Sequence, residues 1–205
     1  MRYDHPYHTP HACWFAPDPL GGGGGVDDQF VLRPFIEHLL EQARFTPAGT
    51  RVLVIGCDTG QLARFLARQG FGVLGVDDSP EAVDAARELA QKQRVPAMFE
   101  PADLATLELP ADSFDLVIGV CLPGRITGPE ERASLLERLH RWLRPGGELW
   151  IDTPVAEPAR QMMSADDLLA ELVAADFDLL WHETRPPAEP GDKPSLQMRC
   201  RRPRA

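Results

Sequence analysis

From residue 50 onward, short runs of apolar residues alternate with segments whose apolar residues recur at helical spacing. Short continuous apolar runs are typical of strands buried on both faces, and the helices between them are typical of crossovers between parallel strands. The pattern therefore predicts an α/β protein of three layers, with helices on both sides of a mostly parallel sheet. The expected strands are residues 52–55, 73–76, 97–100, 114–120 and 148–152.

Helix start and stop signals separate these strands. Gly70 is expected to close the first helix after the first strand. Ser79 is a good N-cap with Pro80 at the first helical position, and this second helix is expected to run to about residue 93. A third helix, marked by apolar residues over 135–143, is expected between strands four and five.

The last part of the sequence has a different pattern. Residues 164–167 have the form of a capping box and open a helix that carries Leu168 and Leu172. Two strand-like segments follow, residues 177–184 and 196–202, with no helix between them. Because a parallel pair needs a long crossover, these two strands are expected to pair antiparallel, which gives a sheet of seven strands.

Composition limits the classes of function. The chain has 205 residues, of which 43% are apolar, and this is typical of one folded domain. Lys and Arg number 21 and Asp and Glu 31, so the net charge of −10 disfavours binding to nucleic acid. No apolar run is long enough to span a bilayer or to form a signal-peptide core, so a cytoplasmic protein is expected. The four cysteines lie far apart and predict buried thiols.

The N-terminal part differs from the rest of the chain. The first 28 residues are rich in His, Pro and aromatic residues and end in the glycine run 21–25, whose backbone freedom predicts a flexible cap. Apolar residues then recur at helical spacing over 27–45. We therefore divide the chain into an N-terminal flexible cap and helix, residues 1–45, and a main domain, residues 46–205.

Three loops that follow expected strands carry the residues of chemical interest. The segment Gly56-Cys57-Asp58-Thr59-Gly60 lies between a strand and a helix, where glycine lets the backbone approach a ligand and lets the helix pack closely. Asp77 ends the second strand, where a carboxylate can accept both hydroxyls of a ribose. Asp103-Leu104 follows the third strand, where an acid can accept from the amino group of adenine. Together these loops predict a site for a nucleoside-containing ligand.

The order and spacing of these segments resemble the class I S-adenosylmethionine-dependent methyltransferases. The resemblance is carried by VLVIGCDTG at 52–60, VLGVDDS at 73–79, LPADSFDLV at 109–117 and LRPGG at 143–147. It covers roughly residues 50–153, and more loosely the C-terminus, and implies a sheet of order 3-2-1-4-5-7-6. It also implies methyl transfer from S-adenosyl-L-methionine to a small molecule. The implied cofactor-binding residues are Gly56, Cys57, Asp58, Gly60, Asp77, Asp78, Asp103, Leu104 and Cys121.

Two positions depart from the family's pattern. Val54 stands where many members have an acid two residues before the first glycine, and Asp58 stands where they have the middle glycine. S-adenosylmethionine carries an ammonium group and a net charge of +1. We therefore hypothesise that Asp58 replaces the missing acid, and the alternative is a loop that no longer binds the cofactor.

The acceptor side of the expected reaction has weaker signals. The segment VCLPG after strand four lacks the Asn/Asp-Pro-Pro-aromatic motif with which related enzymes grip planar amines, which favours an oxygen, sulfur or carbon acceptor. Tyr3, Tyr7 and His8 in the N-terminal cap are candidate catalytic residues. Histidines recur there every three residues, but prolines interrupt the helix that would bring them together, so no metal is expected.

Two other classes of function remain open. One is a non-catalytic regulatory protein that keeps the fold, and the other is a protein or tRNA methyltransferase. The arginines at positions 199, 201, 202 and 204 are able to contact RNA, whereas the negative net charge favours a solvated strand end. No nucleic acid or membrane partner is therefore expected, and the chain is expected to be a monomer or a homodimer.

Overall fold

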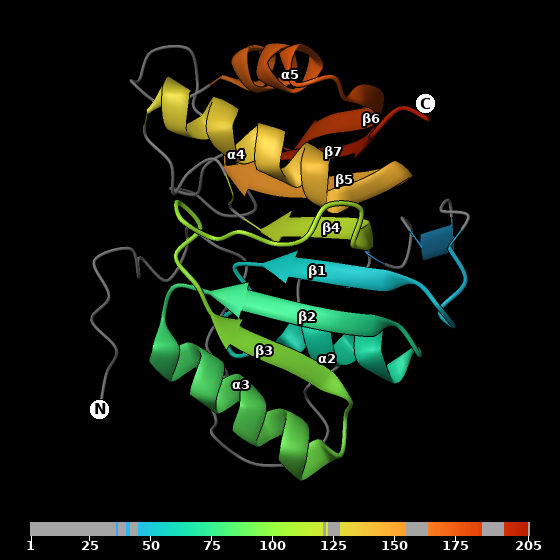
Figure 1. Ribbon diagram of the computed structural model, residues 1–205, viewed down its shortest axis with the longest axis vertical. Helices are drawn as coiled ribbons and strands as arrows, with labels where there is room; N and C mark the ends of the chain where they lie inside the picture. The colour runs from blue at the N-terminus through green and yellow to red at the C-terminus, as the bar shows by residue number, and fades with distance from the viewer. Residues whose placement is uncertain are drawn as a thin grey trace.

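The computed structural model describes residues 36, 40–41, 45–120, 122, 128–154, 164–185 and 195–204. Seven strands form one sheet in the order β3-β2-β1-β4-β5-β7-β6 (Figure 1). Strands β1 to β5 run parallel, and β7 pairs antiparallel with both β5 and β6. The predicted fold class, strand order and C-terminal hairpin are thereby confirmed. The strands are β1 Arg51–Ile55, β2 Gly72–Asp77, β3 Ala97–Pro101, β4 Phe114–Val120, β5 Leu143–Pro154, β6 Asp178–Arg185 and β7 Ser195–Arg201.

Helices cover both faces of this sheet, because successive residues of a buried strand present apolar side chains to opposite sides. Val54 and Trp150 belong to the core cluster that includes the buried residues of α2 and α3. Leu53 and Leu149 belong to a second cluster with α4 and α5. Figure 1 shows α4 in front of the sheet and α2 behind it. The bounds are α2 Gln61–Arg68, α3 Pro80–Gln93, α4 Pro129–Trp142 and α5 Ala165–Ala174.

The predicted helix starts are confirmed by their capping contacts. The hydroxyl of Ser79 accepts a hydrogen bond from the N–H of Ala82 at 3.2 Å, with Pro80 at the first helical position of α3. At the start of α5, Ser164 and Asp167 form the predicted capping box, in which each side chain accepts from the other residue's backbone N–H. These local contacts satisfy backbone donors that the first turn of a helix leaves without partners.

Strand β5 begins earlier than the sequence predicts. The expected strand covered 148–152, whereas β5 starts at Leu143, directly after the end of α4. Leu143 pairs with Phe114, and the register then shifts so that Glu148 lies opposite Leu116. Gly146 has φ +83° in the intervening bulge. Leu143 and Phe114 are far apart in the chain, so their pairing cannot be recognised from the local sequence. Taken alone, residues 143–147 resemble a turn before the strand.

Two further expectations concern thiols and membranes. Cys57 and Cys200 are buried, as predicted for the cysteines. Burial, with a smaller effect of the nearby Glu148 charge, raises the pKa of Cys200 to about 12. Within the residues that the structure describes, no helix has the length and apolar character needed to cross a membrane.

The arginines of β7 do not form a solvated strand end. The antiparallel register places Arg199 and Arg201 beside the buried carboxylate of Glu148, which accepts from their Nη2 atoms at 2.9 and 3.1 Å. The indole N–H of Trp150 donates to the same carboxylate at 3.0 Å. Burial acts to raise the pKa of Glu148, but the hydrogen bonds and positive charges outweigh it and hold this pKa below its ordinary value. The expectation of solvated arginines is therefore wrong for these two residues.

We expect Glu148→Gln to lower the free energy of unfolding at pH 7 by about 2–3 kcal/mol, because charge-assisted hydrogen bonds are lost. Since folding lowers the pKa of Glu148, its stabilisation is present above the unfolded-state pKa and is lost as the pH falls through the folded-state pKa. Urea denaturation at pH 7 and at about pH 3.5 would measure this. A stability difference that persists undiminished in acid would contradict the assignment.

Candidate cofactor site

The loop between β1 and α2 turns sharply back over the end of β2. Gly56 has φ +70°, Asp58 +47° and Gly60 +80°, so three of its five residues have left-handed backbone conformations. The N–H groups of Gly56 and Cys57 both donate to the carbonyl of Val76, at 2.9 and 3.0 Å. Aspartate is among the few side chains that adopt this conformation readily, which explains how Asp58 replaces a glycine without disrupting the turn.

Glycine at position 60 is required by packing. A Cβ atom there would lie 2.6 Å from the ring of Phe99 and 3.0 Å from the Cβ of Ala86. The ring of Phe99 also lies 2.8 Å from the place where a Cβ on Gly75 would stand. The expectation that a glycine lets the helix pack closely is thus confirmed, with Phe99 of β3 as the group that occupies the space.

Asp77 connects the loops that follow β1 and β2. Its side chain is almost fully buried at the carboxyl end of β2. Its Oδ2 accepts from the N–H of Asp58 at 2.9 Å, and its Oδ1 accepts from the N–H of Ser79 at 3.1 Å. Because an ionised carboxylate can accept about four hydrogen bonds, these two contacts are compatible with further bonds from hydroxyl groups.

The loop after β3 lies against Asp77. The N–H of Ala102 donates to the backbone carbonyl of Asp77 at 2.8 Å. The exposed Asp103 accepts at Oδ1 from the N–H of Ala105 at 2.9 Å, which fixes its carboxylate in a tight turn. Leu104 packs against the core cluster of α4 and α5, and its carbonyl accepts from Arg138 at 2.8 Å. Asp103 is therefore placed at the same sheet edge as Asp77.

The structure brings some of the predicted residues together and sets others apart. Gly56, Asp58, Asp77 and Asp103 lie in loops at the carboxyl edge of the parallel strands, and the exposed Asp78 directly follows β2. The side chain of Cys57 belongs to the buried core, and its Sγ donates to the backbone carbonyl of Asp58 within the loop. The remaining predicted residues lie outside the described residues: they are Tyr3, Tyr7, His8 and Cys121.

Sequence reasoning missed a buried polar group at the same edge of the sheet. Asp152 of β5 and Gln197 of β7 lie opposite each other, and Gln197 Nε2 donates to Asp152 Oδ2 at 2.6 Å. Their side chains are 2% and 0% exposed, and the neighbouring Thr153 is also fully buried. The signal was the pair Asp152-Thr153 directly after the apolar residues Leu149, Trp150 and Ile151, since buried polar side chains are unusual without a reason.

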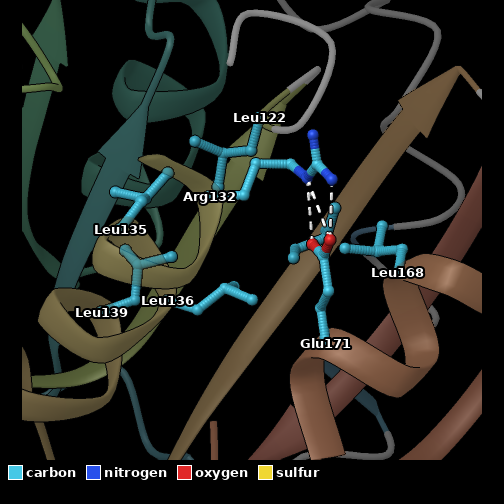
Figure 2. Close-up of a pocket in the computed structure, with 8 residues that line it drawn as sticks. Leu122, Arg132, Leu135, Leu136, Leu139, Leu168 and Glu171 are labelled. Carbon is cyan, nitrogen blue, oxygen red and sulfur yellow. Dashed lines mark hydrogen bonds and ion pairs between the residues drawn. The ribbon is translucent and has the colours of Figure 1, made fainter. Parts of the chain in front are cut away.

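An apolar pocket between α4 and α5 lies on the other face of the sheet from α2. It is small, with a volume of about 10 Å³, and is lined by leucines of α4 and α5, by Ile151 and by Leu122, which follows β4. Figure 2 shows Arg132 of α4 and Glu171 of α5 meeting beside it, and two of their contacts measure 2.7 and 3.0 Å. The hydrogen bond with Glu171 is the main cause of the raised pKa of Arg132. This pocket is distinct from the loops at Asp77.

A comparison of the sequence with known protein families agrees with the arrangement of these loops. The family model described as a methyltransferase domain matches residues 52–147, which include the loop at 56–60, Asp77 and Asp103. The strand order and the antiparallel hairpin agree with this match. Over these residues the chain is similar to the class I S-adenosylmethionine-dependent methyltransferases, the family that the sequence motifs indicated.

Individual proteins that are similar to this chain include two methyltransferases of known name and a solved structure. The chain is 28% identical over 138 residues to the ubiquinone biosynthesis O-methyltransferase of Coxiella burnetii, which covers 67% of this chain and 57% of that protein. It is 39% identical over 106 residues to the 2-methyl-6-phytyl-1,4-hydroquinone methyltransferase of Synechocystis sp. This match covers 50% of this chain and 31% of that protein. A solved methyltransferase structure from Mesorhizobium loti has a TM-score of 0.70 at 24% identity and covers 87% of this chain and all of that one. The structural likeness supports the fold.

We expect Gly60→Ala to destabilise the protein by about 3 kcal/mol, because overpacking against Phe99 adds to the cost of a left-handed alanine. Gly49→Ala is the matched control, since Gly49 has φ +89° with nothing within 4 Å of the added Cβ. It should cost about 1–2 kcal/mol. Chemical denaturation of both variants measures the difference, and equal losses would show that packing against Phe99 is unimportant.

Proposed function

We propose that this chain transfers a methyl group from S-adenosylmethionine to an oxygen, sulfur or carbon atom of a small molecule. The observation that carries the proposal is the buried carboxylate of Asp77, which joins two loops at the carboxyl edge of the sheet. A carboxylate at this place suits the hydroxyl groups of a ribose, which are hydrogen-bond donors.

The residues at this edge fit the cofactor in charge and in hydrogen-bonding type. Four acids follow the first three strands, and they are Asp58, Asp77, Asp78 and Asp103. A ligand of net charge +1 is attracted to such a cluster. When bound, S-adenosylmethionine supplies a methyl group on a positively charged sulfur, which an acceptor atom attacks from the opposite side.

Three of these acids then have distinct roles in binding. Asp77 accepts hydrogen bonds from the ribose hydroxyls, while Asp103, held by the N–H of Ala105, accepts from the adenine amino group. Asp58 lies in the loop after β1 and pairs with the ammonium group. Positive charge becomes more dispersed in the transition state, so the main contribution of the site is to align the two reactants.

The comparisons favour an acceptor that carries hydroxyl groups. The names of the two relatives refer to ubiquinone biosynthesis by an O-methyltransferase and to a hydroquinone. The chain spans 57% and 31% of these proteins, so we extend this chemistry to it as part of the proposal. The segment VCLPG after β4, without an amine-gripping motif, agrees with a hydroxyl acceptor.

We expect wild-type protein to bind S-adenosylhomocysteine and Asp77→Asn to weaken that binding by roughly 30- to 100-fold. The physical reason is the loss of charge-assisted hydrogen bonds, about 2–3 kcal/mol. Isothermal titration calorimetry measures both affinities. Asp84→Asn is the control, because Asp84 is an exposed acid on α3 that pairs with Arg87, and its affinity should stay within about two-fold. A wild-type protein that does not bind the ligand would contradict the proposed function.

Asp58→Gly tests the role of the substituted loop position. If Asp58 pairs with the ammonium group, this variant should bind S-adenosylhomocysteine about 10-fold more weakly, although glycine suits φ +47° better than aspartate. The same calorimetric titration gives the affinity, and the midpoint of thermal unfolding should stay equal or rise. Binding as tight as that of the wild type would refute the replacement of the missing acid.

A protein that binds the cofactor without turnover is the alternative within this fold. It is motivated by Val54 and Asp58, the two departures from the family's pattern. Release of S-adenosylhomocysteine from S-adenosylmethionine, measured over a panel of phenols and thiols, separates the two classes. Binding without release on any acceptor would contradict the enzyme and support the binding protein.

A further inference from the structure

The polar residues at the carboxyl ends of β5 and β7 lie close to the cofactor loops. Ile55 at the end of β1 pairs with Gly119 of β4, and Val120 pairs with Asp152 of β5. Neighbouring strands are about 4.8 Å apart, so Asp152 lies about 10 Å across the sheet from the end of β1.

Asp152 also lies on the correct face of the sheet. Trp150, two residues earlier on β5, belongs to the core cluster that contains α2 and Cys57. Since alternate residues of a strand share a face, Asp152 points to the α2 side, where the loop at 56–60 enters its helix. Gln197 shares that face because it lies opposite Asp152.

The hydrogen bond between the two side chains determines how the amide of Gln197 is oriented. An ionised carboxylate only accepts hydrogen bonds, so the NH₂ group of Gln197 must face Asp152. The amide oxygen Oε1 is buried and has no hydrogen-bonding partner within the part of the chain that the structure describes. Leaving a buried acceptor in that state is unfavourable. A ligand that donates a hydrogen bond would remove this cost.

Glu148, on the same strand and face, provides a contrast. Its carboxylate pairs with two arginines near the middle of β5, four residues before Asp152, so it serves the fold. Asp152 accepts a hydrogen bond from the neutral amide of Gln197, at the edge where the cofactor loops lie. A buried carboxylate within reach of a reacting hydroxyl group is a candidate to accept its proton.

We propose that Asp152 and Gln197 bind a hydroxyl group of the methyl acceptor, and that Asp152 takes up its proton during transfer. This inference rests on the proposed function. In the transfer step the acceptor oxygen forms the new O–CH₃ bond, the methyl–sulfur bond breaks with its electron pair left on sulfur, and the hydroxyl proton passes to the Asp152 carboxylate. Gln197 acts as a positioning residue, because its Nε2 holds the carboxylate while its Oε1 accepts from the ligand.

The first test uses 4-nitrocatechol, a phenol whose absorption spectrum changes on ionisation, bound to protein saturated with S-adenosylhomocysteine. A negatively charged Asp152 beside the hydroxyl disfavours a second negative charge, so the pKa of the bound probe should lie about one unit or more above its value in water. In Asp152→Asn that upward shift should disappear. Spectrophotometric titration of the bound probe measures it independently of turnover.

Three further variants separate this role from a structural one. Gln197→Met removes the positioning amide and should weaken probe binding at least 10-fold. Thr153→Val, next to Asp152, and Glu148→Gln, near the middle of β5, should leave the pKa of the bound probe unchanged. Circular dichroism and thermal unfolding confirm that each variant is folded. If Asp152→Asn does not fold, Gln197→Met decides the outcome, and unchanged probe binding in it overturns the proposal.

Methyl transfer to the probe gives the second readout. With S-adenosylmethionine present, Asp152→Asn should lower kcat by about 100-fold or more while the KM for the cofactor changes little. If wild-type protein binds S-adenosylhomocysteine but not the probe, or if Asp152→Asn has no effect on the probe, the inference about Asp152 fails and the proposed function stands. If S-adenosylhomocysteine itself does not bind, both fail together.

Discussion

The carboxylate of Asp77 is the interaction on which the arrangement of the candidate site depends. It is buried at the end of β2, and both of its oxygens accept from backbone N–H groups, one in the loop after β1 and one at the start of α3. The loop after β3 is joined to the same residue through its backbone carbonyl. Three loops that are separate in the sequence are thereby held in one arrangement before any ligand binds, which lowers the entropic cost of binding.

The two buried acids of β5, Glu148 and Asp152, have different partners on β7, and we assign them different roles. Glu148 is neutralised by arginines of β7, so its charge stabilises the packing of β7 on β5. Asp152, four residues further along the same face, has an amide as its partner from β7. A carboxylate that pairs with two guanidinium groups is a poor proton acceptor, so Glu148 is not suited to acid–base chemistry.

The sequence predicted those parts of the structure that depend on local signals. The cap at Ser79, the capping box at residues 164–167 and the buried parallel strands follow from neighbouring residues, and the family resemblance supplied the strand order. The early start of β5, the pairing of Glu148 with arginines and the contact of Asp152 with Gln197 were not predicted. Each depends on the register between strands distant in the chain, which local periodicity does not encode.

The end of β4 lies between the apolar pocket and Asp152. A Cβ atom on Gly119 would lie 1.8 Å from the Cδ1 of Leu122, so glycine there allows Leu122 to fold back beside the strand. Leu122 then lines the apolar pocket beside the Arg132–Glu171 ion pair. Val120, between these residues, pairs with Asp152. Packing on the α4 side of the sheet therefore holds Leu122 against Gly119, one residue before the position of β4 that pairs with the proposed acceptor-binding Asp152.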